Sequence, residues 1–310
     1  MSACLVCGCE RWAPLFTAPD RLYHTTAKEF AVVRCRECGL ARLDPQPAAG
    51  ELRRYYPENY WFAPDESAAS RLEEAYRRLV LRDHVRFVTQ ALARGPLLDV
   101  GCGGGLFLGM MRERGYAVVG LDFSREAAAI AWKRQRVPAV CGDLVNAPLR
   151  AGSFAGIAMF HVLEHLRDPR AYLEAARELL APDGRLVVQV PNAASWQFRL
   201  LGRRWSGVDV PRHLFDFRDR DVERLLEDCG MEVVRRKYFS LRDNPAGLAS
   251  SLAPGLDPMA RRVRRVAESG GARLAKDLAY LALAAAALPF TLAEAAFRRG
   301  STVMMEARKR

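Results

Sequence analysis

The chain has 310 residues, half of them hydrophobic, and carries 47 Lys and Arg against 36 Asp and Glu, a formal net charge of +11 at pH 7. This length and composition indicate a globular protein with one large core and room for one or two small modules, and the opening MSACLVCGCERWAPLF lacks the apolar stretch of a secretory signal, so we expect a cytoplasmic protein. The positive charge by itself is compatible with nucleic acid, anionic lipid or phosphorylated substrates, or with a solvated surface alone.

The N-terminal segment contains two copies of a Cys-x-x-Cys-Gly motif. They place four cysteines at metal-ligand spacing: Cys4, Cys7, Cys35 and Cys38. A strand over 30–34 would lead into the second motif, which predicts a small zinc ribbon over residues 1–45. A closed four-sulfur site leaves no position for water, so we expect structural zinc that stabilises folding. Cys9 is a spare thiol that could compete as a ligand.

Residues 46–95 are predicted to be a connecting segment, rich in Pro and Tyr, followed by a long helix. Between about Ser67 and Arg94 the apolar residues recur at spacings near three and four, which is typical of an amphipathic helix.

A glycine-rich turn follows the next predicted strand. The strand Pro96–Val100 runs into GCGGG and then a helix, as at the start of an α/β sheet that binds ligands at its strand ends. A dinucleotide fingerprint starting at Gly101 would need a glycine at position 106, where Leu106 stands. Asp99 would repel a pyrophosphate but attract a cation. The turn therefore predicts a positively charged ligand.

S-adenosylmethionine is such a ligand, and this stretch resembles motif I of the class I S-adenosylmethionine-dependent methyltransferases. The resemblance implies that Asp99 helps to place the methionyl amine and that Gly101 and Gly103 let the backbone approach the cofactor. It also implies that Asp122, after the strand 117–121, accepts the ribose hydroxyls.

The third strand, 138–141, ends at Asp143, which the resemblance places beside the adenine amine. Three carboxylates thus follow three successive strands. Three further residues complete the predicted cofactor site. Phe123 follows Asp122, Leu144 follows Asp143, and Phe160 ends the next predicted strand.

The order of elements from about Leu97 to Val234 matches this family, which implies an α/β fold. We expect a seven-stranded Rossmann-like methyltransferase sheet over 96–310, with the zinc ribbon before it and a helical insertion at about 241–300 between the last two strands. The other predicted strands are 154–160, 185–190, 231–238 and an antiparallel 301–308, with helices over 170–180 and 219–229 and a turn at 182–184.

The sequence His161-Val-Leu-Glu164-His165 has the spacing of an inverted zinc-peptidase helix. A strand that ends at Phe160 and the interruption at Asp168-Pro169 argue against one long helix, and hence against that site. The segment instead resembles the one after the fourth strand in the quinone-pathway O-methyltransferases. His161 and His165 are then candidate bases, or residues that hold the loop. Some of those relatives bind a divalent metal through acidic residues in this segment. His161 stands at one of these positions, so the sequence leaves such a metal in doubt.

A further histidine, His213, lies in VDVPRHLFDF before the helix 219–229. In the family such segments commonly cover the acceptor, so His213 is the preferred candidate for a catalytic base, with a structural role as the alternative.

The predicted insertion combines basic and apolar stretches. From Arg261 to Arg310 there are eleven Lys and Arg against four acidic residues, and the sixteen residues Leu278–Ala293 carry no charge. A bilayer span needs roughly 20 apolar residues, and Pro289 should break this run, so we do not expect it to span. Two interpretations stay open: a helical pair over the acceptor pocket, which we prefer, or an interfacial element at the inner membrane face.

The leading hypothesis is methyl transfer to a small-molecule, glycan or lipid-linked acceptor, with oxygen as the preferred acceptor atom. The main alternative is an RNA methyltransferase, since a zinc ribbon also precedes a class I domain in a ribosomal RNA guanine methyltransferase family. We do not expect a nucleic-acid partner, because the ribbon lacks an aromatic-basic stripe and the N-P-P-Y signature is absent. A non-catalytic zinc-ribbon binding module is the other alternative. The N-terminus also resembles zinc-ribbon enzymes that C-methylate nucleotide-linked deoxysugars, so the acceptor atom stays open.

Overall fold

The computed structural model describes residues 2–57, 60, 68–92 and 94–310. The chain forms two compact units, each assembled from three separate stretches of sequence. Unit 1 comprises Met1–Tyr60, Pro191–Val222 and Asp243–Val303, and unit 2 comprises Trp61–Val190, Glu223–Arg242 and Met304–Arg310. The domain limits 1–45, 46–95 and 96–310 stay a prediction.

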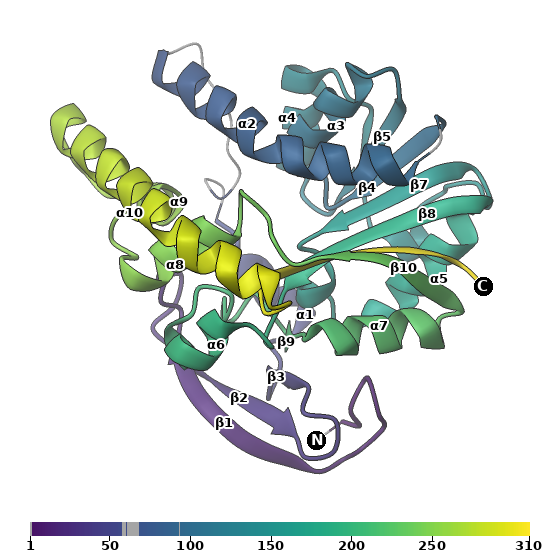
Figure 1. Ribbon diagram of the computed structural model, residues 1–310, viewed down its shortest axis with the longest axis horizontal. Helices are drawn as coiled ribbons and strands as arrows, with labels where there is room; N and C mark the ends of the chain where they lie inside the picture. Colours follow the sequence, from purple (N-terminus) through teal and green to yellow (C-terminus); the bar gives the residue numbers. More distant parts are fainter. Residues whose placement is uncertain (1, 58–59, 61–67, 93) are drawn as a thin grey trace. The chain divides into compact units, whose positions relative to one another are not determined.

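Unit 2 is built on a seven-stranded sheet with the order β10-β11-β8-β7-β4-β5-β6 (Figure 1). Its strands are β4 (Pro96–Val100), β5 (Ala117–Asp122), β6 (Ala139–Cys141), β7 (Phe154–Phe160), β8 (Leu180–Pro191), β10 (Met231–Lys237) and β11 (Thr302–Lys309). The pairs among β6, β5, β4, β7 and β8 are parallel, and β10 pairs with β11 antiparallel. The predicted Rossmann-like methyltransferase sheet is confirmed.

The central strands β4, β5 and β7 are largely apolar because a parallel sheet is covered on both faces. Leu97, Leu98, Ile157 and Leu186 are fully buried. The accompanying helices are α2 (Ala68–Ala91), α3 (Leu106–Arg112), α4 (Arg125–Gln135) and α5 (Pro169–Leu179), with single turns η3 (Leu144–Asn146) and η4 (Leu163–His165). Helix α7 (Asp219–Asp228) begins in unit 1 and ends in unit 2.

The turn predicted at 182–184 lies inside β8, which begins at Leu180. The register with β7 shifts there, since Phe154 is opposite Leu180 but Gly156 is opposite Arg185. Gly184 permits this irregularity, because a Cβ on it would lie 2.9 Å from the carbonyl oxygen of Phe154.

Unit 1 contains a four-stranded antiparallel sheet with the order β1-β2-β3-β9. Its strands are β1 (Trp12–Pro19), β2 (Glu29–Cys35), β3 (Ala41–Leu43) and β9 (Phe215–Asp216). The predicted strand over 30–34 corresponds to β2. The sequence did not predict that residues 215–216 would extend this sheet.

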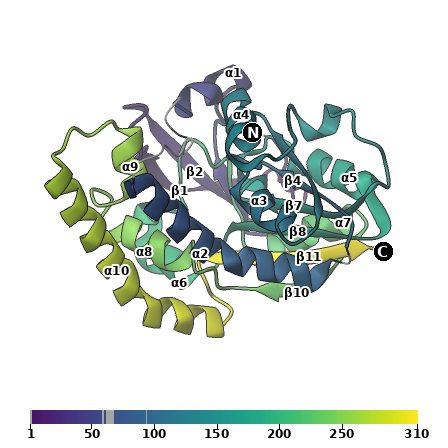
Figure 2. The ribbon, with the colours of Figure 1, turned by 90° about the horizontal axis from the view of Figure 1, so that it is seen from above.

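The helices of unit 1 include the predicted insertion. They are α1 (Ala49–Leu52), η1 (Arg53–Tyr55), α6 (Trp196–Leu201), η5 (Gly202–Arg204), α8 (Asn244–Leu252), α9 (Pro258–Val263) and α10 (Gly270–Ala296). Helices α8 and α10 lie side by side (Figures 1 and 2) and share a small core of Ala249, Tyr280 and Ala284.

The expectation that Pro289 breaks the apolar run is wrong. The helix α10 is 27 residues long and continues on both sides of Pro289. Proline removes one backbone donor, which would have bonded the carbonyl of Ala285. Both Ala285 and Pro289 are exposed, so water can satisfy that carbonyl and the cost of the break stays small.

Candidate functional site

The carboxyl ends of β4 and β5 place two buried carboxylates beside the glycine turn Gly101–Gly105. Asp99 is 4 % exposed and Asp122 is 2 % exposed. Asp122 accepts the backbone N–H of Gly103 at 2.9 Å and that of Ser124 at 2.8 Å, so it ties the glycine turn to the end of β5.

The turn has a backbone that only glycine adopts readily. Gly101 and Gly103 have φ values of 73° and 52°. A Cβ on Gly101 would also lie 2.7 Å from Cγ2 of Val162, so the position has no room for a side chain.

The electrostatics of this site favour a cation. Burial raises the pKa of Asp99 well above its usual range, the charge of Asp122 raises it further, and Arg242 acts in the opposite direction. Burial also raises the pKa of Asp122, against the two N–H groups that it accepts. Two buried carboxylates with little local compensation suit a positively charged ligand, which would pair with them in a site of low dielectric constant.

The other predicted cofactor residues surround the next strand ends. Asp143 caps η3 through the Val145 N–H at 2.9 Å and accepts the hydroxyl of Tyr172 at 2.7 Å. Leu144 is buried, whereas the ring of Phe123 is 52 % exposed.

Phe160 lies at the end of β7, the strand that pairs with β4, and its ring packs against two other aromatic side chains. Its ring meets Phe107 edge to face at 5.0 Å and His84 at 4.9 Å between centroids. The structure thus gathers the predicted strand-end residues of unit 2 along one edge of the sheet.

His161 is held at both ring nitrogens. Its Nδ1 lies 3.1 Å from the Glu164 carboxylate and its Nε2 lies 3.1 Å from the side-chain amide of Gln189. Its backbone has a φ of 56°, and its N–H donates to the Gln189 carbonyl. His165 lies in η4, half-buried, and its N–H donates to the carbonyl of Val162.

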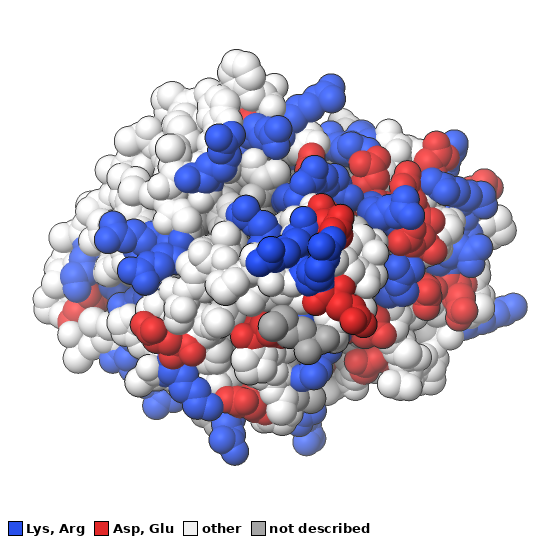
Figure 3. Space-filling view, turned by 90° about the horizontal axis from the view of Figure 1, so that it is seen from below, with Lys and Arg blue, Asp and Glu red and all other residues white. Residues whose placement is uncertain are grey.

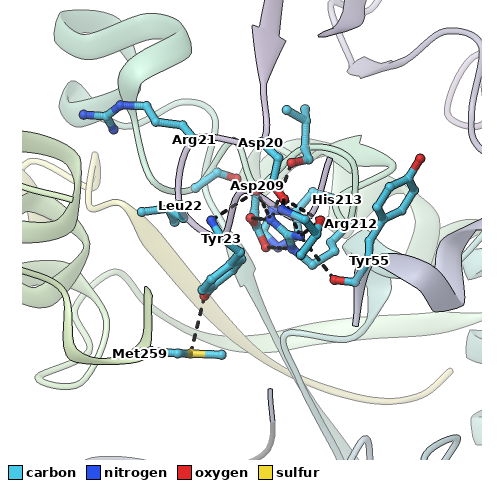
Figure 4. Close-up of polar contacts among 12 residues, drawn as sticks. Asp20, Arg21, Leu22, Tyr23, Tyr55, Asp209, Arg212, His213 and Met259 are labelled. Carbon is cyan, nitrogen blue, oxygen red and sulfur yellow. Dashed lines mark hydrogen bonds and ion pairs between the residues drawn. The ribbon is translucent and has the colours of Figure 1, made fainter. Parts of the chain in front are cut away.

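In unit 1, His213 comes directly after Arg212 in the sequence. Arg212, Asp20 and Asp209 form what we call the buried arginine network (Figure 4). The Arg212 side chain is fully buried and donates to Asp20 at 2.7 Å and to Asp209 at 2.6 Å. Burial opposes its charge, but the two carboxylates outweigh burial and raise the pKa of Arg212 well above its usual value. Tyr23 lies against the guanidinium, 4.4 Å from ring centroid to Cζ.

This network positions His213. The His213 N–H donates to the Asp209 carbonyl at 2.8 Å, and its Nδ1 lies 2.8 Å from the carbonyl oxygen of Gly207. A carbonyl accepts only, so Nδ1 carries the proton and Nε2 is the basic nitrogen of the neutral ring. His213 belongs to unit 1, whereas His161 and His165 belong to unit 2.

The four motif cysteines meet as predicted, in what we call the cysteine cluster (Cys4, Cys7, Cys35 and Cys38). Their sulfurs all lie within 4.8 Å of one another, with 3.5 Å between Cys4 and Cys38 and 3.6 Å between Cys7 and Cys35. Tetrahedral zinc with bonds of about 2.3 Å needs sulfurs about 3.8 Å apart. The cluster therefore fits that ion. Cys9 instead contacts the backbone of Arg11.

The family described as a methyltransferase domain matches residues 69–236, more than half of the chain. The match covers the glycine turn and all three strand-end carboxylates. The chain belongs to the class I S-adenosylmethionine-dependent methyltransferases. Its enzymatic activity is therefore methyl transfer from that cofactor.

Curated relatives agree with this family. The methyltransferase is 30 % identical over 173 residues to a ubiquinone biosynthesis O-methyltransferase of Cronobacter sakazakii, covering 52 % of this chain and 70 % of that one. It is 31 % identical over 176 residues to a Cereibacter sphaeroides protein of the same name, covering 51 % and 67 %. In fold it is similar to geranyl diphosphate C-methyltransferase from Streptomyces coelicolor, with a TM-score of 0.50, 16 % identity and coverage of 86 % and 89 %.

Several residues at these sites were missed in the sequence. Tyr172 and Gln189 face predicted residues from α5 and β8, and no local signal marks them. Asp209 and Arg212 had a weak signal, since an acid and an arginine three residues apart often pair. Asp20 is 192 residues from Arg212 and could not be paired with it from sequence.

Proposed function

We propose that the methyltransferase transfers a methyl group to oxygen on a small-molecule, glycan or lipid-linked acceptor, with S-adenosylmethionine held in unit 2. The pair of buried carboxylates Asp99 and Asp122 beside the glycine turn is the observation that carries this proposal. When bound, the cofactor supplies an electrophilic methyl group on a cationic sulfur.

The roles of the unit 2 residues follow from their places. Asp99 would pair with the cationic amine, and Asp122 would accept ribose hydroxyls with the lone pairs that the Gly103 and Ser124 N–H groups leave. Asp143 and Leu144 would border the adenine, with Phe123 as an apolar cover. Phe160 would form the wall behind the transferred methyl.

His213 is our proposed base toward the acceptor hydroxyl. The orientation of its ring supports this role, since Nδ1 donates to the Gly207 carbonyl and the basic Nε2 is turned the other way. His161, with a partner at each ring nitrogen, would instead hold the loop after β7, and His165 would have the same positioning role. Oxygen as the acceptor atom is supported by the similarity to the ubiquinone biosynthesis O-methyltransferases.

The test of the activity is incubation of the purified protein with methyl-labelled cofactor and fractionated cell extract. Label in a quinone-precursor, lipid, glycan or nucleotide-sugar fraction supports the proposal, and label in RNA alone overturns it. His213→Ala should lower turnover by about 10²-fold or more while cofactor affinity stays near wild type. Unchanged turnover would remove His213 from the mechanism.

The face drawn in Figure 3 gives no support to an RNA acceptor. On the face drawn in Figure 3 the basic side chains are scattered and mixed with acidic ones, without a continuous basic stripe. Phosphate-backbone binding uses such a stripe.

The cysteine cluster is proposed to hold a structural zinc ion. The sulfur distances support this assignment, and the closed ligand set supports a role in folding. It is not proposed to take part in methyl transfer.

We also propose a peripheral membrane contact through α10 of an otherwise cytoplasmic enzyme. Among the described helices, α10 is the one long and apolar enough to cross a membrane by length and composition, and 22 % of its most apolar window is buried. Its outer face, called the α10 apolar face, consists of Leu274, Leu278, Leu281 and Leu292, exposed by 59, 57, 43 and 51 %.

The buried side of α10 is the more polar one. It carries Tyr280, Thr291 and Glu294, and Glu294 accepts the side chain of Gln197 at 2.7 Å. A helix that turns polar groups inward and leucines outward is suited to an apolar surface outside the protein. The exposed Arg298 and Arg299 beyond its C-terminal end add attraction to anionic lipid headgroups.

Co-sedimentation with vesicles tests this contact. Wild type should sediment with phosphatidylcholine vesicles that contain phosphatidylglycerol, more at low than at moderate salt. Leu274→Ser/Leu278→Ser should abolish sedimentation, while the control Leu79→Ser/Val234→Ser, which changes exposed apolar residues of α2 and β10, should not. No vesicle binding by wild type would overturn the membrane contact. A dimer that the α10 substitutions dissociate would show that the α10 apolar face binds a second copy of the chain and not a lipid surface.

A further inference from the structure

A basic cavity lies in unit 1. It has a volume of about 440 Å³ and is lined by Tyr23, His24, Thr25, Arg54, Pro57, Val263 and Arg264. The volume is in the range of small-molecule sites, about 300–1,000 Å³. The lining offers two guanidinium groups and an imidazole, while the hydroxyls of Tyr23 and Thr25 donate to Met259 and Asp20, and none of these described residues is acidic.

Arg21 and Arg264, beside this cavity, donate to backbone carbonyls and not to acids. Arg264 donates to the carbonyl oxygens of Leu22 at 2.7 Å and Arg21 at 3.2 Å, and Arg21 donates to the carbonyl oxygens of Arg204 and Ser251. Burial lowers the pKa of Arg21, and the charges of Arg204 and Arg264 lower it further.

Within the part of the chain that the structure describes, no carboxylate is within ion-pair distance of Arg21, Arg54, Arg204 or Arg264. Arg261, in the preceding turn of α9, shows the contrast, because it pairs with both Glu268 and Asp277. Arg21 and Arg264 are half-buried, where arginines are ordinarily paired, so they have capacity for an anion, and the exposed Arg54 and Arg204 add positive charge nearby.

One wall of the cavity is rigid because it rests on the buried arginine network. Asp20 accepts the backbone N–H groups of Tyr23 at 3.2 Å and Thr25 at 2.7 Å, and the Thr25 hydroxyl at 2.5 Å. Tyr23 in turn lies against the Arg212 guanidinium (Figure 4). Asp20 and Asp209 share the one guanidinium of Arg212, so the network keeps a net charge of −1. The lining residues Arg54 and Arg264 outweigh this charge.

We infer that this cavity binds a phosphate or diphosphate ester group of the methyl acceptor. Guanidinium groups bind phosphate oxygens through paired, charge-assisted hydrogen bonds, and the His24 imidazole can add a further donor. The inference rests on the proposed function, since it gives the acceptor an anionic anchor in the unit that also carries His213. It narrows the acceptor to phosphorylated molecules, such as nucleotide-linked or lipid-linked ones.

Calorimetric titration of the full chain with inorganic pyrophosphate tests the site. Arg53 and Arg54 are adjacent and exposed in η1, but only Arg54 lines the cavity, so Arg53→Ala is a matched control for Arg54→Ala. Wild type and Arg53→Ala should bind pyrophosphate equally, and Arg54→Ala should bind about tenfold or more weakly. Equal weakening by both substitutions, or no binding by wild type at moderate salt, would overturn the inference.

The same samples are titrated with S-adenosylhomocysteine, which binds in unit 2 under the proposed function. Retained nucleoside binding without pyrophosphate binding overturns the cavity assignment alone. Loss of both overturns the proposed function as well. Uridine diphosphate and farnesyl diphosphate, compared with pyrophosphate, then distinguish a nucleotide-linked from a lipid-linked source of the phosphate.

Discussion

Asp99 connects burial, charge and ligand choice in one side chain. The strand that carries it is buried from Leu97 to Val100, so the carboxylate loses its water, and Asp122 adds a second negative charge nearby. Both effects favour the protonated acid in the free protein. A cationic ligand amine reverses this preference, because it stabilises the ionised form.

Cofactor binding is therefore expected to release protons and to tighten as pH rises toward the pKa of free Asp99. Titrations with S-adenosylhomocysteine between pH 6 and 8, in two buffers of different ionisation enthalpy, measure the protons released. Asp99→Asn should weaken binding by about 10- to 100-fold and remove the pH dependence. The exposed Asp183→Asn is the control, and pH-independent wild-type affinity would contradict the expectation.

Arg212 is expected to be essential for the stability of unit 1. Arg212→Gln leaves Asp20 and Asp209 buried without their cation, which should cost about 3–5 kcal/mol of unfolding free energy. Urea unfolding followed by tryptophan fluorescence measures the change, with the exposed Arg53→Gln as control. A midpoint equal to that of wild type would show that the network contributes little to folding.

At the scale of elements, the sequence located the strands of unit 2, whereas β1, β3 and β9 of unit 1 were not predicted. The bounds of β4 and β7 agree with the predicted ones, because apolar runs ended by glycine or histidine are local signals. The continuity of α10 was not predicted, since the effect of Pro289 depends on the solvent exposure of one carbonyl.

The contribution of Glu294, near the C-terminal end of α10, to folding stability is expected to depend on pH. Glu294 is fully buried, and burial raises its pKa to about 7, against the hydrogen bonds from Gln197 and Ser301 that lower it. The folded state therefore holds a proton that the unfolded state releases near pH 4.5. Stability from this group is fully present below about pH 4.5 and is lost as pH rises through about 7.

Glu294→Gln, which imitates the protonated acid, should remove this loss. The stability difference between variant and wild type is expected to grow by about 3 kcal/mol at most from pH 5 to pH 8. Thermal or urea unfolding across this range provides the measurement. A difference that does not change with pH would mean that Glu294 is ionised in the folded protein at all these values.

At the scale of the whole molecule, the cysteine cluster and the carboxylate pair belong to different units. Metal analysis of the purified protein is expected to find one zinc per chain. Cys35→Ser should lose the metal and destabilise unit 1 by several kcal/mol, while S-adenosylhomocysteine binding in unit 2 persists. The exposed Cys141→Ser should keep the metal, and a zinc-free wild type of equal stability would refute the structural role.

From the sequence, the resemblance to the methyltransferase family implied the seven-stranded sheet of unit 2, and the motifs of strand and following carboxylate carried that resemblance. These features are local: a parallel strand buried on both faces is a continuous apolar run, and the functional residue follows it directly. The tertiary structure alone decided that three distant stretches form unit 1, that β9 pairs with β3, and that Asp20 meets Arg212. Those contacts join residues far apart in the chain, where burial and partner choice depend on the packed fold and leave no periodic signal.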